Sequence, residues 1–365
     1  MKTYLNKEID KTKILLAKLT ANNLDGILFY SPENRFWLSE FMSSEGYLLF
    51  SKTQTTLFLD GRYITDGQAK AKNVTNVAEM ITNNPGGFLQ MLKEQLIANN
   101  INNLGFESNF LTYQHYQVLQ KQLAPITLVP VDFSELRAVK TNKEINALAQ
   151  ACAIGDLAIE NVLKVIKPGM TEREVEQVII NTFISAGAEK PSFDTIVASG
   201  ERGALPHGRA TERVIQNNEL ITIDFGCIYN GFCSDTTRTI GVGQPSAKLQ
   251  EIFQIVYEAQ DAAIKAIKPG VLTSTIDQIA RDYINSKGYG EYFTHSTGHG
   301  VGIEIHEFPR VSPFCQVPLE PGMIITVEPG IYIPNLGGVR IEDDILVTET
   351  GYELLTKSDR KLILK

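Results

Sequence analysis

The sequence predicts an α/β (α+β) protein of two domains, and three observations support this prediction. The chain has 365 residues, which is enough for two domains at roughly 100–200 residues each. Its first third alternates strand-like apolar runs with amphipathic helical segments, which is typical of an α/β layer. A segment near the middle recurs 101 residues later, which predicts a second domain made of two related halves.

The N-terminal domain is expected to span residues 1–133. Its helical patterns cover residues 6–24, 86–99 and 112–123. Its strand-like runs cover residues 26–31, 46–50, 55–61 and 104–108. The charged segment 134–145 comes next and indicates a boundary that leads into a helix. The C-terminal domain is therefore expected to span residues 134–365.

The C-terminal domain contains the internal repeat. Residues 163–188 align without gaps on residues 264–289, and both windows contain IKPG. Each window reads as a helix, a Pro-Gly break and a second helix that starts at a threonine. Chance similarity between two amphipathic helices is the alternative, but the matching break favours duplication. A crevice between two related halves is where we expect a functional site.

Composition excludes several classes of protein. A net charge of −8 argues against a nucleic-acid surface, because phosphate binding needs a concentrated basic face. The sequence has no run of about 18 apolar residues and its first residues, MKTYLNKEIDKTK, lack the apolar core of a signal peptide. Its four cysteines contain no CxxC pair. We therefore expect a cytoplasmic protein with reduced cysteines and no membrane partner.

Residues 220–240 predict a β-hairpin that brings two carboxylates together. Asn230-Gly231 between alternating strands is a strong signal for a two-residue turn. Counting outward from this turn, Asp224 faces Thr237, and Asp235 lies on the same face as its diagonal neighbour. A solvent-facing strand is the alternative, but the residues around Asp224 are apolar and aspartate is disfavoured in strands without a partner.

Two further acids and a group of histidines follow in similar settings. Glu328 ends an apolar strand-like run just before Pro-Gly, and Glu342 lies in residues 337–347, read as one strand. That strand would carry Arg340, Glu342 and Asp344 on one face. Residues 294–307 hold three of the five histidines: His295, His299 and His306. Each acid alone could be an exposed charge, so it is their combination that points to a site.

Several carboxylates in one crevice repel each other, and removing them from water costs several kcal/mol apiece. Cations would neutralise them. Four carboxylates and one imidazole suit two divalent metal ions, and a set dominated by oxygen favours Mn²⁺, Fe²⁺ or Co²⁺ over a thiolate zinc site. Two such ions can hold a hydroxide as nucleophile and polarise a carbonyl oxygen.

These residues resemble, in order and context, the five-ligand signature of the pita-bread metallopeptidases, which include methionine aminopeptidases, aminopeptidase P and prolidase. The resemblance implies a C-terminal pita-bread domain whose metal ligands are Asp224, Asp235, His299, Glu328 and Glu342. The motifs are the Asp-to-Asp spacing of eleven, TGHG, EPG and RIED. SPENRFWLSEF and the segment from SSEGYLLF to DGRY resemble the creatinase/prolidase N-terminal domain, which methionine aminopeptidases generally lack. Creatinase has lost the ligands that this chain keeps.

The resemblance also implies roles for residues around the ligands. His207, in GALPHG, and His295 would contact substrate and stabilise the tetrahedral intermediate, and His306 would hydrogen-bond near the proline subsite. Glu328 would accept the proton. Arg340 could orient Glu342 or hold a substrate carboxylate, and a plain charge pair on the strand face is the alternative.

The function implied is metal-dependent hydrolysis of the bond between an N-terminal residue and a following proline, by a hydroxide bound to two metal ions. The context strings favour an Xaa-Pro aminopeptidase, with an Xaa-Pro dipeptidase (prolidase) as the alternative and a non-catalytic binding module as the remote one. We expect two divalent cations per subunit, Mn²⁺ first and Co²⁺, Fe²⁺ or Zn²⁺ as alternatives. The expected partners are a peptide with proline at its second position and a second copy in a homodimer.

Overall fold

A computed structural model describes residues 2–6, 8–81 and 87–365. The chain divides into two compact units, one of Ile9–Arg137 and one of Met1–Glu8 with Ala138–Lys365. The expected domain boundary between residues 133 and 134 lies four residues before the end of the first unit. The division of the chain into folding domains at this boundary stays a prediction.

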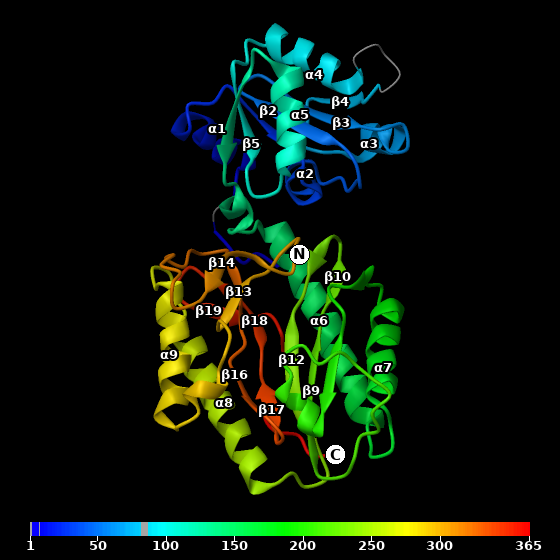
Figure 1. The fold of residues 1–365 in the computed structure, drawn as a ribbon, viewed down its shortest axis with the longest axis vertical. Helices are drawn as coiled ribbons and strands as arrows, with labels where there is room; N and C mark the ends of the chain where they lie inside the picture. Colours follow the sequence, from blue (N-terminus) through cyan, green and yellow to red (C-terminus); the bar gives the residue numbers. More distant parts are fainter. Residues whose placement is uncertain (1, 7, 82–86) are drawn as a thin grey trace. The chain divides into compact units, whose positions relative to one another are not determined.

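The unit of Ile9–Arg137 is a mixed sheet with helices packed on it (Figure 1). The strand order is β4-β3-β2-β1-β5-β6, with β1 antiparallel to β2 and parallel to β5. The strands are β1 (Gly26–Phe29), β2 (Tyr47–Ser51), β3 (Thr55–Leu59), β4 (Asn76–Glu79), β5 (Asn103–Glu107) and β6 (Thr127–Val131). The helices are α1 (Lys11–Ala21), α2 (Pro32–Ser39), α3 (Ile64–Lys70), α4 (Gly87–Ala98) and α5 (Tyr113–Leu123), followed by the short η1 (Ser134–Arg137).

The helices and strands predicted for this unit are confirmed, with shifted ends. Helix α1 starts later than the predicted residue 6, because the Asp10 side chain accepts a hydrogen bond from the Lys13 amide and begins the helix there. The predicted start of α4, residue 86, lies outside the described residues. The short elements α2, α3, β4 and β6 were not predicted.

The unit of Ala138–Lys365 has helices on two sides and strands between them (Figure 1). The pair α6 (Asn142–Val165) and α7 (Glu172–Ser185) lies on one side, and the pair α8 (Ala247–Lys265) and α9 (Thr273–Ser286) on the other. The antiparallel sheet β12-β9-β8 consists of β8 (Ile196–Ser199), β9 (Glu219–Phe225) and β12 (Thr236–Val242). The sheet β14-β13-β15-β18-β19 consists of β13 (Gly298–Gly300), β14 (Glu307–Val311), β15 (Ile324–Val327), β18 (Asp343–Val347) and β19 (Tyr352–Leu354).

Smaller elements complete this unit. The pair β16 (Gly330–Ile333) and β17 (Gly337–Arg340) is antiparallel, and so is the small sheet β11-β10-β7. Its strands are β7 (Lys190–Pro191), β10 (Cys227–Tyr229) and β11 (Phe232–Cys233). Two short 3₁₀ helices are η2 (Gly200–Ala204) and η3 (Gly290–Tyr292).

The predicted repeat is confirmed in the backbone pairing of the two halves. The turn before α7 binds a later segment of the first half, where the Gly169 amide donates to the Ile215 carbonyl at 3.0 Å. The turn before α9 does the same in the second half, where the Gly270 amide donates to the Leu319 carbonyl at 2.8 Å. Each turn is followed by an isolated antiparallel bridge, Thr171 with Val214 and Leu272 with Pro318. Both halves thus fasten their second helix in the same way.

The hairpin register is also confirmed. Tyr229 pairs with Phe232 across Asn230-Gly231, and Asp224 pairs with Thr237. Both turn residues have positive φ, 50° for Asn230 and 78° for Gly231, as a type I′ turn requires. All four cysteines are free thiols, as expected.

The single strand predicted for residues 337–347 is wrong. The chain forms β17 up to Arg340 and β18 from Asp343, and these strands belong to different sheets. Between them the Glu342 amide donates to the Thr237 carbonyl of β12 at 3.1 Å, instead of to a neighbour in either sheet. Glu342 therefore lies at a crossing between sheets, where an alternation count along one strand does not apply.

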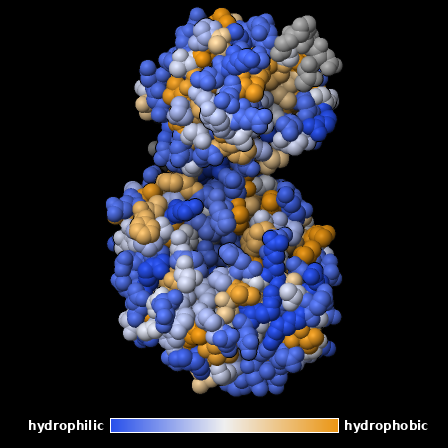
Figure 2. Space-filling view, viewed as in Figure 1, coloured by the Kyte–Doolittle hydropathy of each residue, from blue (hydrophilic) through white to orange (hydrophobic). Residues whose placement is uncertain are grey.

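Buried apolar side chains join the helices to the sheets in both units. One core cluster connects α6 and α7 with β9 and β12, and two others lie under α8 and α9. On the face shown in Figure 2, hydrophobic residues form small groups among hydrophilic ones. Over the described ranges, the helices fall short of the length and apolar character needed to cross a membrane.

Neighbouring residues of α7 allow a test of this core. Phe183 is fully buried beside Phe225, whereas Ile184 is 64% exposed. Phe183→Ala should lower the free energy of unfolding by about 3–5 kcal/mol, because it leaves a cavity between helix and sheet. Ile184→Ala should change it by less than about 0.5 kcal/mol. Denaturant unfolding of both variants measures the difference, and equal losses would contradict this packing.

Candidate metal centre

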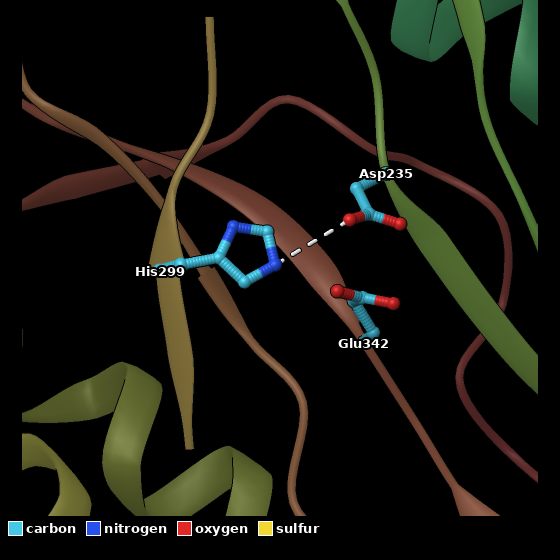
Figure 3. Close-up of side chains that lie close together, drawn as sticks. All are labelled: Asp235, His299 and Glu342. Carbon is cyan, nitrogen blue, oxygen red and sulfur yellow. Dashed lines mark ion pairs between the residues drawn. The ribbon is translucent and has the colours of Figure 1, made fainter. Parts of the chain in front are cut away.

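Three predicted ligands converge in the C-terminal unit. One ligand atom from each of Asp235, His299 and Glu342 lies within 4.8 Å of the other two. Figure 3 shows the three side chains pointing toward one another from separate segments. Asp235 precedes β12, His299 is on β13, and Glu342 lies between β17 and β18. The group therefore joins the first half of the repeat to the second, as expected for a site in the crevice between them.

The other two predicted ligands lie beside this group. Glu328 follows β15, and its Oε1 is 3.4 Å from Nε2 of His299. Asp224 is on β9, and its Oδ2 accepts a hydrogen bond from Nη2 of Arg340 at 2.7 Å. Burial and the charges of Glu342, Asp224, Asp344 and Glu328 raise the pKa of Asp235 well above its ordinary value, which reflects how close these acids are.

The imidazole of His299 is oriented toward the acids by its own backbone. Nδ1 lies 3.0 Å from the Gly300 carbonyl, which can only accept, so Nδ1 carries the proton of the neutral ring. Burial lowers the pKa of His299 to about 4, so the ring is neutral near pH 7. The lone pair of Nε2 then faces Oδ2 of Asp235 at 3.6 Å and Oε1 of Glu328 at 3.4 Å. A lone pair facing carboxylate oxygens is repulsive unless a proton or a metal cation lies between them.

Two carboxylate oxygens of the cluster also indicate a site for a cation. Oδ1 of Asp224 and Oε1 of Glu342 are buried without a hydrogen-bond partner among the described residues. A buried carboxylate oxygen without a donor is costly, and it is the kind of ligand that hard divalent cations prefer. The other oxygen of each acid has a donor. Oδ2 of Asp224 accepts from Arg340 at 2.7 Å, and Oε2 of Glu342 accepts from Oγ1 of Thr237 at 2.7 Å. The residues present therefore fit a divalent cation.

The glycines beside His299 are required by close backbone packing. A Cβ on Gly298 would lie 2.1 Å from the Thr326 carbonyl oxygen, and one on Gly300 would lie 2.5 Å from that of Phe308. Side chains at these positions would push β13 away from the neighbouring segments. Thr326 also fixes the ligands, because its Oγ1 accepts from the His299 amide at 3.1 Å and donates to Oε1 of Glu328 at 3.4 Å.

Arg340 binds Asp224 directly and reaches Glu342 through Thr237, whose hydroxyl accepts from Nε of Arg340 at 3.1 Å and donates to Oε2 of Glu342 at 2.7 Å. Its Nη1 donates to the Tyr332 hydroxyl at 2.8 Å and to the Pro206 carbonyl at 3.1 Å. Arg340 is 3% exposed, and its guanidinium offsets part of the negative charge of the acids. Arg340 thereby connects a ligand acid with the loop that carries His207.

His295 is already engaged on both ring nitrogens. Nδ1 lies 2.7 Å from the Ser296 carbonyl, and Nε2 lies 2.9 Å from the Tyr332 hydroxyl. Burial lowers the pKa of His295 to about 4, so the neutral ring donates from Nδ1 and accepts from Tyr332 at Nε2. Tyr332 in turn accepts from Arg340, which completes a chain from His295 to Asp224.

The remaining two predicted histidines are exposed near the cluster. The His306 ring lies edge-on to the His299 ring with centroids 4.4 Å apart. His207 is close enough to Asp224, His295 and His306 to influence the pKa of each. Both side chains are free to meet a ligand from solvent.

Sequence reasoning missed several polar residues of this site. Tyr332, Thr237 and Thr326 contact predicted site residues, and Asp344 accepts from the Asp235 amide at 2.9 Å. A hydroxyl inside an apolar strand such as IYI gives no signal of its own. The sequence placed Asp344 on one strand face with Glu342, but the amide that binds its carboxylate, that of Asp235, lies 109 positions earlier in the sequence.

Comparison with known proteins agrees with this geometry. Residues 146–349 match the model of metallopeptidase family M24, and residues 11–139 match the creatinase/prolidase N-terminal domain. The chain belongs to metallopeptidase family M24. Its N-terminal unit is the creatinase/prolidase type and its C-terminal unit is the pita-bread domain, as predicted. Membership of this M24 family implies divalent metal ions.

Named relatives of this M24 protein match along almost the whole chain. An Xaa-Pro dipeptidase from Pyrococcus horikoshii is 40% identical over 97% of this chain and 99% of its own length. The structure of an Xaa-Pro dipeptidase from Bacillus anthracis is similar with a TM-score of 0.92 and 42% identity, covering 97% of this chain and 99% of that chain. The structure of an X-Pro aminopeptidase from Thermotoga maritima has a TM-score of 0.88 at 34% identity, covering 98% of this chain and 100% of that chain.

Cation binding to the metal-free protein should release protons. Burial raises the pKa of Glu328 to about 8, and burial together with neighbouring acids raises those of Asp235 and Glu342 well above their usual range. The metal-free folded state therefore holds protons at pH 7 that bound cations displace, so affinity should rise from pH 6 to pH 8. Without metal, the folded state binds more protons than the unfolded state, so stability should fall as pH rises toward 8.

Calorimetric titration with Mn²⁺ in two buffers of different ionisation enthalpy measures this proton release. A heat that differs between the buffers at pH 7 is the expected result. Equal heats in both buffers, with binding observed, would show that the carboxylates are already ionised in the metal-free protein.

Proposed function

We propose that the protein hydrolyses the peptide bond between an N-terminal residue and a following proline. The observation that carries this proposal is the cluster of four carboxylates around an imidazole whose lone pair faces two of them. Such a cluster suits metal-assisted hydrolysis. The preference for proline comes from the names of the relatives, all three of which refer to an Xaa-Pro or X-Pro bond.

Asp224, Asp235, His299, Glu328 and Glu342 would hold the cations. A pair of divalent cations bound there would polarise the scissile carbonyl oxygen and lower the pKa of an attacking water. Glu328 is the proposed proton acceptor, because its half-buried carboxylate lies at the edge of the cluster and cation binding would displace the proton that it holds in the metal-free protein. Its carboxylate would take the proton of the attacking water and pass it to the proline nitrogen as the bond breaks.

The three further histidines have different proposed roles. His207 and His306 are exposed beside the cluster, so their rings can hydrogen-bond a bound peptide and the developing oxyanion. His295 uses both nitrogens within the protein. We assign it an effect on the intermediate through Tyr332, whose hydroxyl it orients, in place of the direct contact that the resemblance implied.

The length of the substrate separates two candidate activities. The sequence favoured an aminopeptidase that accepts longer peptides, and the Thermotoga maritima structure bears that name at 34% identity. The two named dipeptidases are 40% and 42% identical to this chain. We therefore put the Xaa-Pro dipeptidase first and keep the aminopeptidase as the second candidate. Manganese as the native cation, a homodimer and a cytoplasmic location stay predictions.

Ala-Pro and Ala-Pro-Ala distinguish these candidates. With metal-stripped protein reconstituted with Mn²⁺, we expect rapid cleavage of Ala-Pro and little release of alanine from the tripeptide, with EDTA abolishing activity. Chromatographic detection of free alanine provides the measurement. Efficient cleavage of the tripeptide would establish the aminopeptidase instead. Cleavage of neither peptide by metal-loaded protein would refute the proposed function.

Glu328→Gln should reduce kcat by at least about 100-fold, because the amide cannot accept the proton of the attacking water. The fold should be unchanged, since the only side-chain hydrogen bond that the structure shows to this carboxylate is the 3.4 Å contact from Thr326. Steady-state kinetics and circular dichroism together provide the test. Activity near that of the wild type would remove Glu328 from the catalytic role.

His207→Ala and Asp235→Asn separate substrate contact from metal binding. His207→Ala should lower kcat/KM by about 10-fold or more while keeping the metal, because its side chain is exposed outside the cluster. Asp235→Asn should lose metal, because it removes one of the three converging ligands. Elemental analysis after dialysis compares the two variants. Loss of metal in His207→Ala would show that this histidine is a ligand.

A further inference from the structure

In each half of the internal repeat, a buried acid pairs with an arginine, and the two residues together bind a segment that carries a histidine. In the first half the pair is Glu172 with Arg202, called here the first anchor. In the second half it is Asp277 with Arg281, called the second anchor. Both acids lie on the second helix of their half, α7 and α9, and both are fully buried. Neither acid is among the ligands or the substrate contacts proposed above.

The first anchor closes the loop of residues 199–211, which carries His207. The Glu172 carboxylate accepts from the amide and hydroxyl of Ser199 at 2.9 and 2.8 Å, at one end of the loop. At the other end it accepts from the amide and hydroxyl of Thr211 at 3.1 and 2.7 Å. Arg202, paired with the same carboxylate, also donates to the Arg209 carbonyl at 2.8 Å, two residues beyond His207.

The second anchor repeats this arrangement around His295. Oδ1 of Asp277 accepts from the amide and hydroxyl of Thr297 at 3.0 and 2.9 Å. Arg281 binds the Asp277 carboxylate through Nε at 2.9 Å and Nη2 at 3.0 Å. Its Nη2 also donates to the His295 carbonyl at 2.8 Å, and its Nη1 to that of Phe293 at 3.2 Å.

The two anchors share three features. A buried carboxylate accepts both the amide and the hydroxyl of a serine or threonine, it pairs with an arginine, and that arginine also donates to a carbonyl in the histidine-bearing segment. Ser199 and Thr297 lie 98 positions apart, close to the offset of 101 between the repeated helices. The acids lie 105 positions apart and the arginines 79, so the two halves share the arrangement of the polar groups and not the aligned residues.

We propose that Glu172 and Asp277 are positioning residues, which hold His207 and His295 respectively in place for the reaction. This inference rests on the proposed function, because it assigns the two histidines to substrate and intermediate. Four hydrogen bonds to one carboxylate keep both ends of the His207 loop fixed, while Arg340 binds the Pro206 carbonyl near its tip. Charge-assisted hydrogen bonds of this kind are stronger than neutral ones, so the loop is rigid before substrate arrives.

Kinetics of Glu172→Gln and Asp277→Asn test this proposal in the full-length, Mn²⁺-loaded protein. Each variant should lower kcat/KM for Ala-Pro by up to about 100-fold, the loss that a misplacement of about 1 Å can bring. Each should keep the metal content of the wild type. Glu174→Gln and Asp282→Asn are matched controls on the same helices. Among the described residues, the Glu174 carboxylate accepts only from the Thr171 amide and hydroxyl, and that of Asp282 only from the Gln278 side chain. Loss of metal in the anchor variants would overturn the proposal.

Double-mutant cycles identify the histidine through which each anchor acts. Glu172→Gln in a His207→Ala background should cost little further activity, whereas in a His295→Ala background its full effect should remain within about twofold. Asp277→Asn should show the opposite pattern. Equal losses in both backgrounds would indicate general destabilisation and would overturn the assignment.

Hydrogen exchange measured by mass spectrometry tests the anchors without any activity. Residues 199–211 should exchange faster in Glu172→Gln, and residues 293–300 in Asp277→Asn, with both segments unchanged in the control variants. Unchanged exchange in the anchor variants would overturn the proposal. If the wild type cleaves no Xaa-Pro peptide, the proposed function fails, and exchange still shows whether the anchors hold the loops.

Discussion

Repulsion among buried acids is the constraint on which the C-terminal unit is built. Asp224 and Glu328 lie close enough to raise the pKa of both Asp235 and Glu342, and the neutral His299 adds a lone pair to the same space. Apolar packing alone does not favour such an arrangement. The surrounding structure offsets part of the repulsion through Arg340 and through hydroxyl donors, and leaves the rest for cations. The fold therefore holds together a set of acids that would separate in its absence.

Much of this site follows from local sequence patterns. The turn at Asn230-Gly231 determines the pairing of both strands, so counting from it places Asp224 and Asp235 on one face without any knowledge of the rest. The fold class and the repeat were predictable for a related reason, because helix periodicity and the Pro-Gly breaks are encoded within short windows. Family resemblance then supplied the order of the ligands.

What the sequence did not predict depends on contacts between distant segments. Arg340 and Glu342 alternate as neighbours on a strand face, yet Arg340 binds Asp224, 116 positions away. The strand carrying them breaks because Glu342 pairs with β12, and nothing within residues 337–347 indicates that partner. Tyr332 and the two anchors were missed for the same reason. Each has an ordinary local explanation: Tyr332 as a core residue, Glu172 as an acid in a first helical turn, and Asp277 as the partner of an arginine four residues later on the same helix.

The two-residue turn between Asp224 and Asp235 also limits how this chain can change during evolution. A residue added within the turn lengthens the loop and leaves the strand pairing as it is. A residue inserted into either strand between an aspartate and the turn would move that aspartate to the opposite face of the sheet. Viable insertions in this segment are therefore confined to two positions, Asn230 and Gly231. The mechanical requirement is therefore the pairing of the two strands, and the spacing of eleven follows from that pairing together with a turn of only two residues.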